Sequence, residues 1–192
     1  MTIIKMEGSI FRKLEAKAKA DFERWEEVNK AKKEKQCFNS IKSCRVGVFC
    51  EWAVKMHLLN YYKFDLLELN VFGEKERHNK KQFRGKPDIE VITSTKHIKA
   101  EIKGISEGQP KSQVLTYHAD KYHKNNFTHL IFCELFLNEE NEVAEVEIYL
   151  IEQLRDTVRN PIYKNLYGKE CYTNENFINT LKNKKQIRSI VD

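Results

Sequence analysis

The segment 85–104 constrains the fold most, because it reads as two short strands joined by the polar turn 93–96. In the second strand apolar side chains alternate with charged ones, Ile98, Ala100 and Ile102 against Lys99, Glu101 and Lys103. Alternate side chains of a strand point to the same face, so Glu101 and Lys103 project together, away from the apolar face. Asp88 opens the neighbouring strand and can join them at one edge.

Two carboxylates and a lysine in one small volume suit phosphodiester hydrolysis. This reaction needs a hard divalent cation, which prefers oxygen ligands and lowers the pKa of a bound water. A lysine beside the cation can position that water and stabilise the charge that develops on the phosphate. The alternative interpretation is a solvated hairpin edge that carries Asp88, Glu101 and Lys103 without chemistry.

The residues Pro87-Asp88, followed by Glu101-Ile102-Lys103, resemble the motif of the PD-(D/E)XK nuclease superfamily, which spans two adjacent strands. The resemblance implies an α/β, restriction-endonuclease-like fold, in which an αβββαβ core holds a mixed central sheet flanked by helices. It also implies that Asp88 and Glu101 bind Mg²⁺ and that Lys103 is the catalytic lysine.

The order of the predicted elements follows that core over residues 45–150. Helical spacing of apolar residues predicts a first helix over 9–36, capped by Ser9. The core elements are a helix over 45–62, strands over 63–72, 88–92 and 97–104, a helix over 111–122, and strands over 128–135 and 143–152. We expect a single domain over 1–192, with a helical C-terminal extension over 153–192.

Glu51 lies in the middle of the predicted helix 45–62, which is apolar on nearly all sides and should be largely buried. A buried carboxylate is unfavourable unless it is paired or binds a metal. Nucleases of this superfamily often contribute a glutamate to the site from the helix before the sheet, and Glu51 resembles that catalytic residue. The alternative is a glutamate at the solvated rim, paired with Lys55 one turn away.

Two further groups of residues flank the motif. The basic segment 73–86 suits contacts to phosphates, which dominate affinity for nucleic acids, or it is simply a surface loop. Its expected DNA contacts are Lys80, Lys81, Arg84 and Lys86. Gln113 and Tyr117 are one helical turn apart and resemble the RecB-like branch of the superfamily. There such accessory residues lie near the metal and the DNA.

Charge and cysteine content bear on the partner and the compartment. The net charge of +6 is compatible with a polyanion partner. Five cysteines without a CxxC pair predict a reduced cytoplasmic protein with buried thiols. An iron–sulfur cluster, as in some exonucleases of the superfamily, is disfavoured because no C-terminal cysteine cluster follows. No segment has the roughly 20 apolar residues of a membrane helix, and the first residues lack a signal-peptide pattern.

The sequence therefore favours a Mg²⁺-dependent restriction endonuclease that acts on double-stranded DNA. One site cuts one strand, so a double-strand cut requires a homodimer or a second nuclease-bearing chain. Because no target-reading element is evident, the chain also looks like the small cleavage subunit of heterodimeric Type IIS enzymes, whose larger subunit reads the target. Two alternatives stay open: a RecB-like repair or phage exonuclease, and a non-catalytic nucleic-acid-binding or assembly protein on the same fold.

Overall fold

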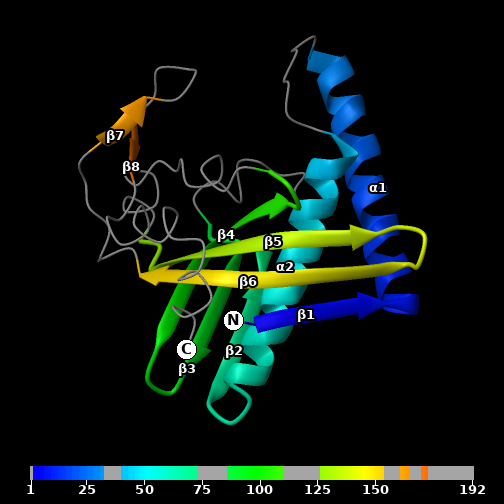
Figure 1. The fold of residues 1–192 in the computed structure, drawn as a ribbon. Helices are drawn as coiled ribbons and strands as arrows, with labels where there is room; N and C mark the ends of the chain where they lie inside the picture. Colours follow the sequence, from blue (N-terminus) through cyan, green and yellow to red (C-terminus); the bar gives the residue numbers. More distant parts are fainter. Residues whose placement is uncertain are drawn as a thin grey trace.

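A computed structural model describes residues 2–32, 40–72, 86–109, 126–153, 161–164 and 170–172. In this part the fold is mixed α/β, with a six-stranded sheet in the order β1-β6-β5-β4-β3-β2 and two helices (Figure 1). The sheet contains β1 (Thr2–Glu7), β2 (Leu66–Val71), β3 (Ile89–Thr93), β4 (His97–Ser106), β5 (His129–Asn138) and β6 (Val143–Gln153), and the helices are α1 (Gly8–Lys32) and α2 (Ile41–Tyr61). No helix of the described residues is long and apolar enough to cross a membrane.

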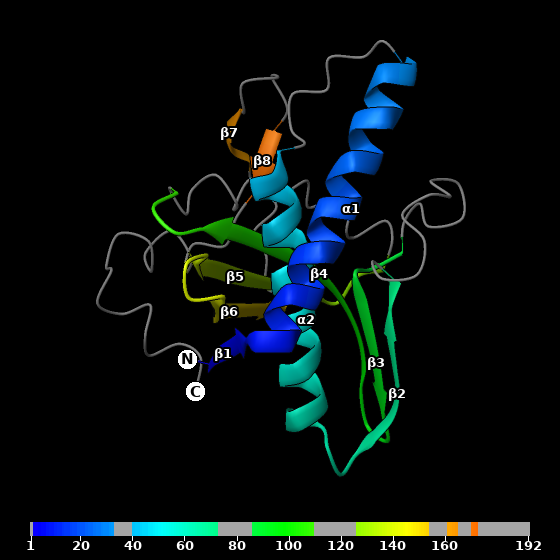
Figure 2. The same cartoon turned by 90° about the vertical axis from the view of Figure 1, so that its right-hand side faces the viewer.

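The sheet is mixed and strongly twisted. Its neighbouring strands are antiparallel except β4 and β5, which are parallel. Strands β2 and β3 run steeply across the direction of β5, β6 and β1, and β4 bends between the two groups (Figure 2). Parallel neighbours need a crossover connection. Residues 110–125 of that connection, including the predicted helix 111–122, lie outside the described residues.

Helix α2 lies at the centre of the core. It begins at Ile41 because the Ser40 side chain caps it, accepting a hydrogen bond from the Ser43 N–H at 3.2 Å. One side of α2 packs on α1, where the rings of Phe49 and Phe11 are 5.6 Å apart. The other side packs on the sheet, and the apolar face of β4 joins this core through Ile98, Ala100 and Ile102.

Strand β4 approaches α2 so closely that only glycine fits at position 104. A Cβ atom there would lie 2.5 Å from Cγ1 of Val46 and 2.8 Å from Sγ of Cys50. Both side chains belong to the buried core, so neither can move aside without displacing its neighbours. Gly104 therefore fixes how near α2 comes to the sheet.

We expect Gly104→Ala to lower the free energy of unfolding by about 1–3 kcal/mol, because the added methyl group overpacks this contact. Urea denaturation of the variant and of the parent chain measures the change. Val46→Ala removes the nearest clashing atom. The double variant should therefore lose less free energy of unfolding than the sum of the losses in the two single variants. An unchanged midpoint for Gly104→Ala would contradict the close approach.

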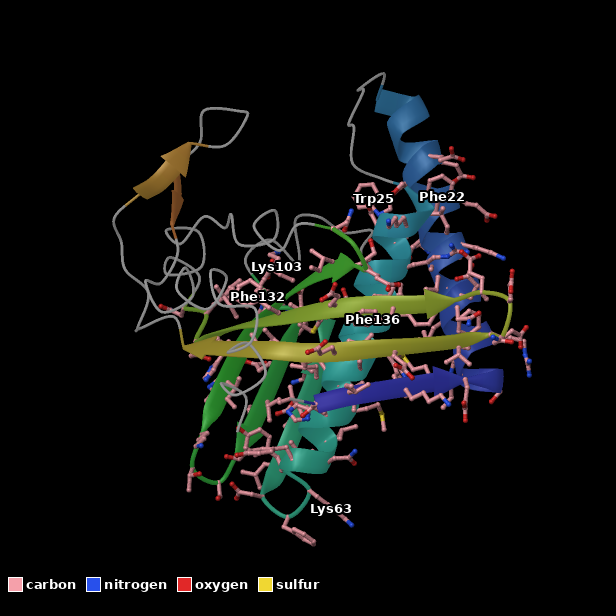
Figure 3. All side chains as sticks on the ribbon, in the orientation of Figure 1. Phe22, Trp25, Lys63, Lys103, Phe132 and Phe136 are labelled. Carbon is pink, nitrogen blue, oxygen red and sulfur yellow. The ribbon has the colours of Figure 1, made fainter. Side chains whose placement is uncertain are left out.

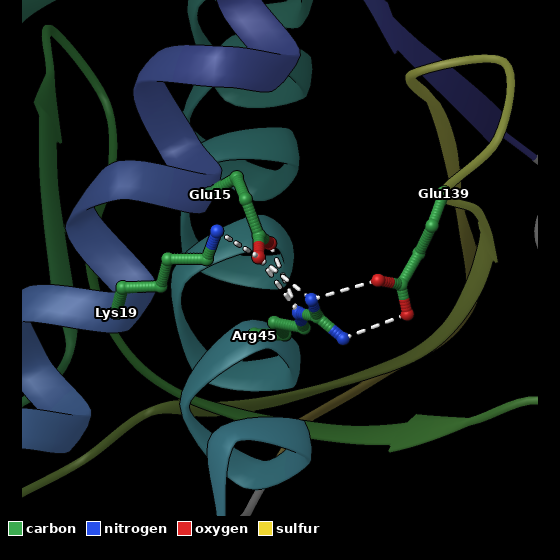
Figure 4. A network of polar contacts seen from close by, with 4 residues as sticks. All are labelled: Glu15, Lys19, Arg45 and Glu139. Carbon is green, nitrogen blue, oxygen red and sulfur yellow. Dashed lines mark hydrogen bonds and ion pairs between the residues drawn. The ribbon is translucent and has the colours of Figure 1, made fainter.

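Arg45 joins both helices to the turn between β5 and β6 (Figure 4). Its Nε and Nη2 donate to the Glu15 carboxylate of α1 at 2.9 and 2.7 Å. Its Nη1 and Nη2 donate to the two oxygens of Glu139 at 2.8 and 2.9 Å. The Glu15 hydrogen bonds, with help from Glu139, raise the pKa of Arg45. This double fork ties α1, α2 and the far end of the β5–β6 hairpin together.

The structure confirms the predicted hairpin and the helix and strands on either side of it, but it corrects the predictions at both ends. The sequence does not predict β1, which pairs along its whole length with β6 as an edge strand. Helix α1 begins at Gly8, not after a Ser9 cap, because Gly8 turns the chain from strand to helix at φ +57, where glycine is unstrained. Residues 33–39 lie outside the described residues.

The prediction of a helical extension over 153–192 is wrong where the structure describes it. Strand β6 continues to Gln153, and two short strands follow, β7 (Pro161–Lys164) and β8 (Glu170–Tyr172). They pair antiparallel in a small sheet of their own. Strands of three and four residues are too short to show a clear alternation of apolar and polar side chains, so their sequence alone carries little signal.

Candidate functional site

The register of the β3–β4 hairpin brings Asp88, Glu101 and Lys103 together. Ile89 pairs with Ala100, which places Asp88 opposite Glu101 across the two strands. The Ile102 N–H donates a hydrogen bond to Oδ2 of Asp88 at 2.8 Å, so the Asp88 carboxylate reaches across to β4. Lys103 Nζ lies 2.6 Å from Oε1 of Glu101. We call these three residues the hairpin site.

The hairpin site lies on the face of the sheet opposite α2. Ile102 and Gly104 face α2, so the alternating side chains of Glu101 and Lys103 face the other way. On β5, Leu130 pairs with Glu101 and Phe132 pairs with Lys103 (Figure 3). Both of these apolar side chains are fully buried, whereas Glu101 keeps 8% of its surface exposed. The ion pair therefore lies against an apolar wall, where its electrostatic attraction is stronger than in water.

Asp88 also has a structural role at the end of the β3 ladder. Its carboxylate accepts a hydrogen bond from the Ile102 N–H of β4, just beyond the last residue pair of the hairpin register. Its own carbonyl accepts a hydrogen bond from the Phe72 N–H at 3.1 Å, which anchors it to the end of β2. Asp88 is therefore held between three strands, and this position suits a carboxylate that must be rigidly placed.

Glu51 comes from a different layer of the molecule. It is 7% exposed on α2, so its predicted burial is confirmed and a place at the solvated rim is wrong, while a pairing with Lys55 stays a prediction. Helix α2 packs against the face of β4 opposite to Glu101 and Lys103. The structure thus places Glu51 on the other side of the strand, and a part for it in the hairpin site stays a prediction.

Of the expected DNA contacts, the structure describes one. Lys86, two residues before Asp88, is exposed, and its Nζ lies 5.0 Å from the centre of the Phe72 ring. The others and the accessory pair lie outside the described residues: Lys80, Lys81, Arg84, Gln113 and Tyr117.

A second charged group on the same hairpin shows how the register pairs opposite charges. Glu90 lies opposite Lys99, with 3.9 Å between Oε1 and Nζ, and it also pairs with His97 at 2.7 Å. The sequence shows these residues, but it does not show that the Glu90 carboxylate already contacts two neighbouring side chains. Lys99 therefore provides a matched comparison for Lys103 on the same strand and face.

The donors of the hairpin site fit Mg²⁺ better than a cation that needs a closed protein cage. Mg²⁺ keeps several waters and is usually held by one or two carboxylates together with substrate phosphates. Asp88 and Glu101 supply two carboxylates on one face. Within the described ranges, no group of three or more His, Cys, Asp or Glu side chains is arranged to hold a metal ion.

The described cysteine thiols take no part in the hairpin site. Cys44, Cys50 and Cys133 are free and buried, which confirms the prediction of buried thiols for these three. Burial raises the pKa of the Cys133 thiol, and its hydrogen bond with Cys50 raises it further. Both belong to the core between α2 and the sheet, where they serve packing.

No family model matches the sequence, and the searches of curated proteins and of solved structures likewise gave no match.

Two substitutions separate the hydrogen bond that Asp88 accepts from the negative charge that it carries. Asp88→Asn keeps an oxygen that accepts the Ile102 hydrogen bond, so its stability should stay near that of the parent chain. Asp88→Ala loses the acceptor and should unfold with about 1–2 kcal/mol less free energy. Urea denaturation of the three proteins makes the comparison, and equal stabilities would show that the hydrogen bond contributes nothing.

Proposed function

We propose that the chain is a Mg²⁺-dependent DNA endonuclease of the restriction type. The observation that carries the proposal is the hairpin register, which sets Asp88 opposite Glu101 and leaves Lys103 bonded to Glu101 on the same face. A Pro-Asp turn followed by Glu-x-Lys on the next strand is the motif of the PD-(D/E)XK nucleases, which this chain resembles. The hairpin register, which sets Asp88 opposite Glu101, supports this proposal.

The element order also supports the proposal. Helix α2 is followed by the antiparallel strands β2, β3 and β4, and β4 then lies parallel to β5. An αβββαβ core has this order of elements, and its third and fourth strands are parallel, as β4 and β5 are here. The mixed, twisted six-stranded sheet is compatible with such a core.

Each residue of the hairpin site has a distinct task in the proposed reaction. Asp88 and Glu101 would hold the cation, which, when bound, lowers the pKa of a water and neutralises phosphate charge. Lys103 donates hydrogen bonds to the attacked phosphate and stabilises the charge that develops on it. Glu101 orients the Lys103 ammonium group, because the two are already in contact. The apolar wall of Leu130 and Phe132 limits the access of water to this ion pair.

One hairpin site hydrolyses one strand of a duplex. A double-strand cut therefore needs a second site, from another copy of this chain or from a larger subunit that also reads the target. We favour the role of a small cleavage subunit, since the hairpin site accounts for the chemistry and no target-reading element is evident from the sequence. A purified chain of this kind should nick DNA and show little preference for sequence.

The decisive activity experiment incubates the purified chain with supercoiled plasmid and Mg²⁺, and compares Lys103→Met with Lys99→Met. Both substitutions remove a lysine from the same face of β4, but Lys99 is paired with Glu90 and lies outside the hairpin site. Lys103→Met should lower the rate of strand cleavage by about 100-fold or more, and Lys99→Met should leave it unchanged. Gel electrophoresis of the plasmid products gives the rates.

The products and the controls separate the alternatives. Nicked or linear plasmid supports an endonuclease, whereas mononucleotides released only from free ends support the RecB-like exonuclease. Asp88→Asn and Glu101→Gln should both abolish Mg²⁺-dependent cleavage, while Glu90→Gln should not. Two outcomes would contradict the nuclease assignment. One is an equal cleavage rate for Lys103→Met and the parent chain, and the other is no cleavage by the parent chain even when a target-reading subunit is added.

A further inference from the structure

Three large apolar side chains are exposed on and beside the turn that joins α2 to β2. Tyr61, Phe64 and Leu67 are 69%, 96% and 70% exposed. Elsewhere in the described part of the chain, the other exposed large apolar side chains are Ile3 at 50% and Ile10 at 41%. A local concentration of exposed apolar groups marks an interaction site. We call residues 61–67 the aromatic tip.

The aromatic tip is held in a fixed conformation. The N–H groups of Asp65 and Leu66 both donate to the Tyr62 carbonyl, at 2.9 and 2.8 Å. The Asp65 carboxylate accepts a hydrogen bond from the Ser94 hydroxyl, which ties the tip to the turn between β3 and β4. Tyr61 and Tyr62 support each other edge to face, with ring centres 4.8 Å apart. An aromatic side chain on a turn that is already fixed loses little conformational entropy when it binds.

Lysines flank the exposed ring. Lys63 Nζ lies 5.4 Å from the centre of the Phe64 ring, and Figure 3 shows Lys63 at the far end of the molecule from Lys103. Lys96 lies in the adjoining β3–β4 turn. The Ser94 hydrogen bond lowers the pKa of Asp65, and Lys96 contributes to the shift. The Asp65 charge is therefore compensated within the tip, and Glu68 beyond it is bonded to Asn70.

We propose that the aromatic tip is a second DNA contact, in which Phe64 inserts as a wedge between neighbouring base pairs and Lys63 and Lys96 bind the flanking phosphates. This inference rests on the proposed function for its choice of DNA as partner. Apolar side chains such as phenylalanine are the groups that proteins insert between base steps. Lysines bind the phosphates on either side without reading the sequence.

The distance from the hairpin site agrees with one continuous duplex. Ser94 comes six positions after Asp88, at the other end of β3, which corresponds to about 20 Å at the rise of an extended strand. Base pairs of B-DNA stack about 3.4 Å apart, so the tip lies about six base pairs from the scissile phosphate. A duplex held at the hairpin site and at the tip is therefore contacted over about half a helical turn.

The form of the tip favours DNA over a protein partner. Lysine is depleted at the centre of protein–protein interfaces, yet Lys63 lies directly beside the most exposed ring. The tip is also a single short turn, residues 61–67, whereas a standard protein interface takes roughly 20–30 residues from each partner. A narrow, rigid, lysine-flanked ring matches a groove lined by phosphates.

The test measures binding of a 24-base-pair duplex by fluorescence anisotropy, with Ca²⁺ in place of Mg²⁺ to slow cleavage. Phe64→Ala should weaken binding about tenfold, because one stacked aromatic contact is lost. Phe64→Leu should retain most of the affinity, since leucine is also a wedge residue. Ile10→Ala is the matched control, an exposed apolar side chain on α1 whose loss should leave affinity unchanged. Lys63→Gln should reduce the slope of log affinity against log salt concentration by about one, the value of one phosphate contact.

A 2-aminopurine base in the duplex reports insertion directly, because its fluorescence rises when the base is unstacked. The parent chain should produce this rise at one position, and Phe64→Ala should not. Unchanged DNA affinity and unchanged fluorescence in Phe64→Ala would overturn the proposal. The proposal would also be overturned if Phe64→Ala kept its DNA binding but lost self-association or binding to vesicles. Phe64-dependent binding without any cleavage would reject only the nuclease, whereas cleavage with Phe64-independent binding would reject only the wedge.

Discussion

The close contact between α2 and β4 at Gly104 decides which face of β4 packs against α2 and which face carries the charged residues of the hairpin site. Gly104 faces α2, because a Cβ there would overlap Val46 and Cys50. The side chains of β4 alternate between the two faces of the sheet. Ile102 and Ala100 are therefore buried beneath the helix, while Lys103 and Glu101 lie on the opposite face. The position of the hairpin site is thus a consequence of core packing, and the Arg45 fork holds α1 and the β5–β6 turn to the same helix.

The hairpin register then decides which residues meet. A slip of one residue between β3 and β4 would turn Asp88 away from Glu101 and expose the apolar face. The polar turn prevents this slip, because the Thr93 hydroxyl accepts hydrogen bonds from the N–H groups of Thr95 and Lys96, at 3.3 and 2.9 Å. Asp88 adds its own bond to Ile102 at the other end of the hairpin. The same contacts that stabilise the hairpin therefore set the spacing of the proposed metal ligands.

The parts of this arrangement that depend on local sequence could be predicted, and the non-local parts could not. Alternation within 97–104 correctly predicted the charged face of β4, and the apolar surroundings of Glu51 correctly predicted its burial. The apolar wall of Leu130 and Phe132 depends on the parallel pairing of β4 with β5, which no local pattern encodes. Strand β1 was missed for the same reason, because it pairs with the distant β6, whereas β7 and β8 were missed because strands of three and four residues show no clear alternation. The exposure of Phe64 follows from how the turn after α2 is anchored, which apolar composition alone does not show.

The central claim is that Asp88 and Glu101 together form a cation site, and mapping that site with Fe²⁺ tests it most directly. Fe²⁺ occupies Mg²⁺ sites, and with ascorbate and peroxide it generates radicals that cleave the nearest backbone. In the parent chain bound to duplex DNA, we expect protein cleavage centred on residues 88 and 101, suppressed by excess Mg²⁺ and absent in Asp88→Asn. Cleavage centred on another part of the chain, or cleavage that persists unchanged in Asp88→Asn, would contradict the account.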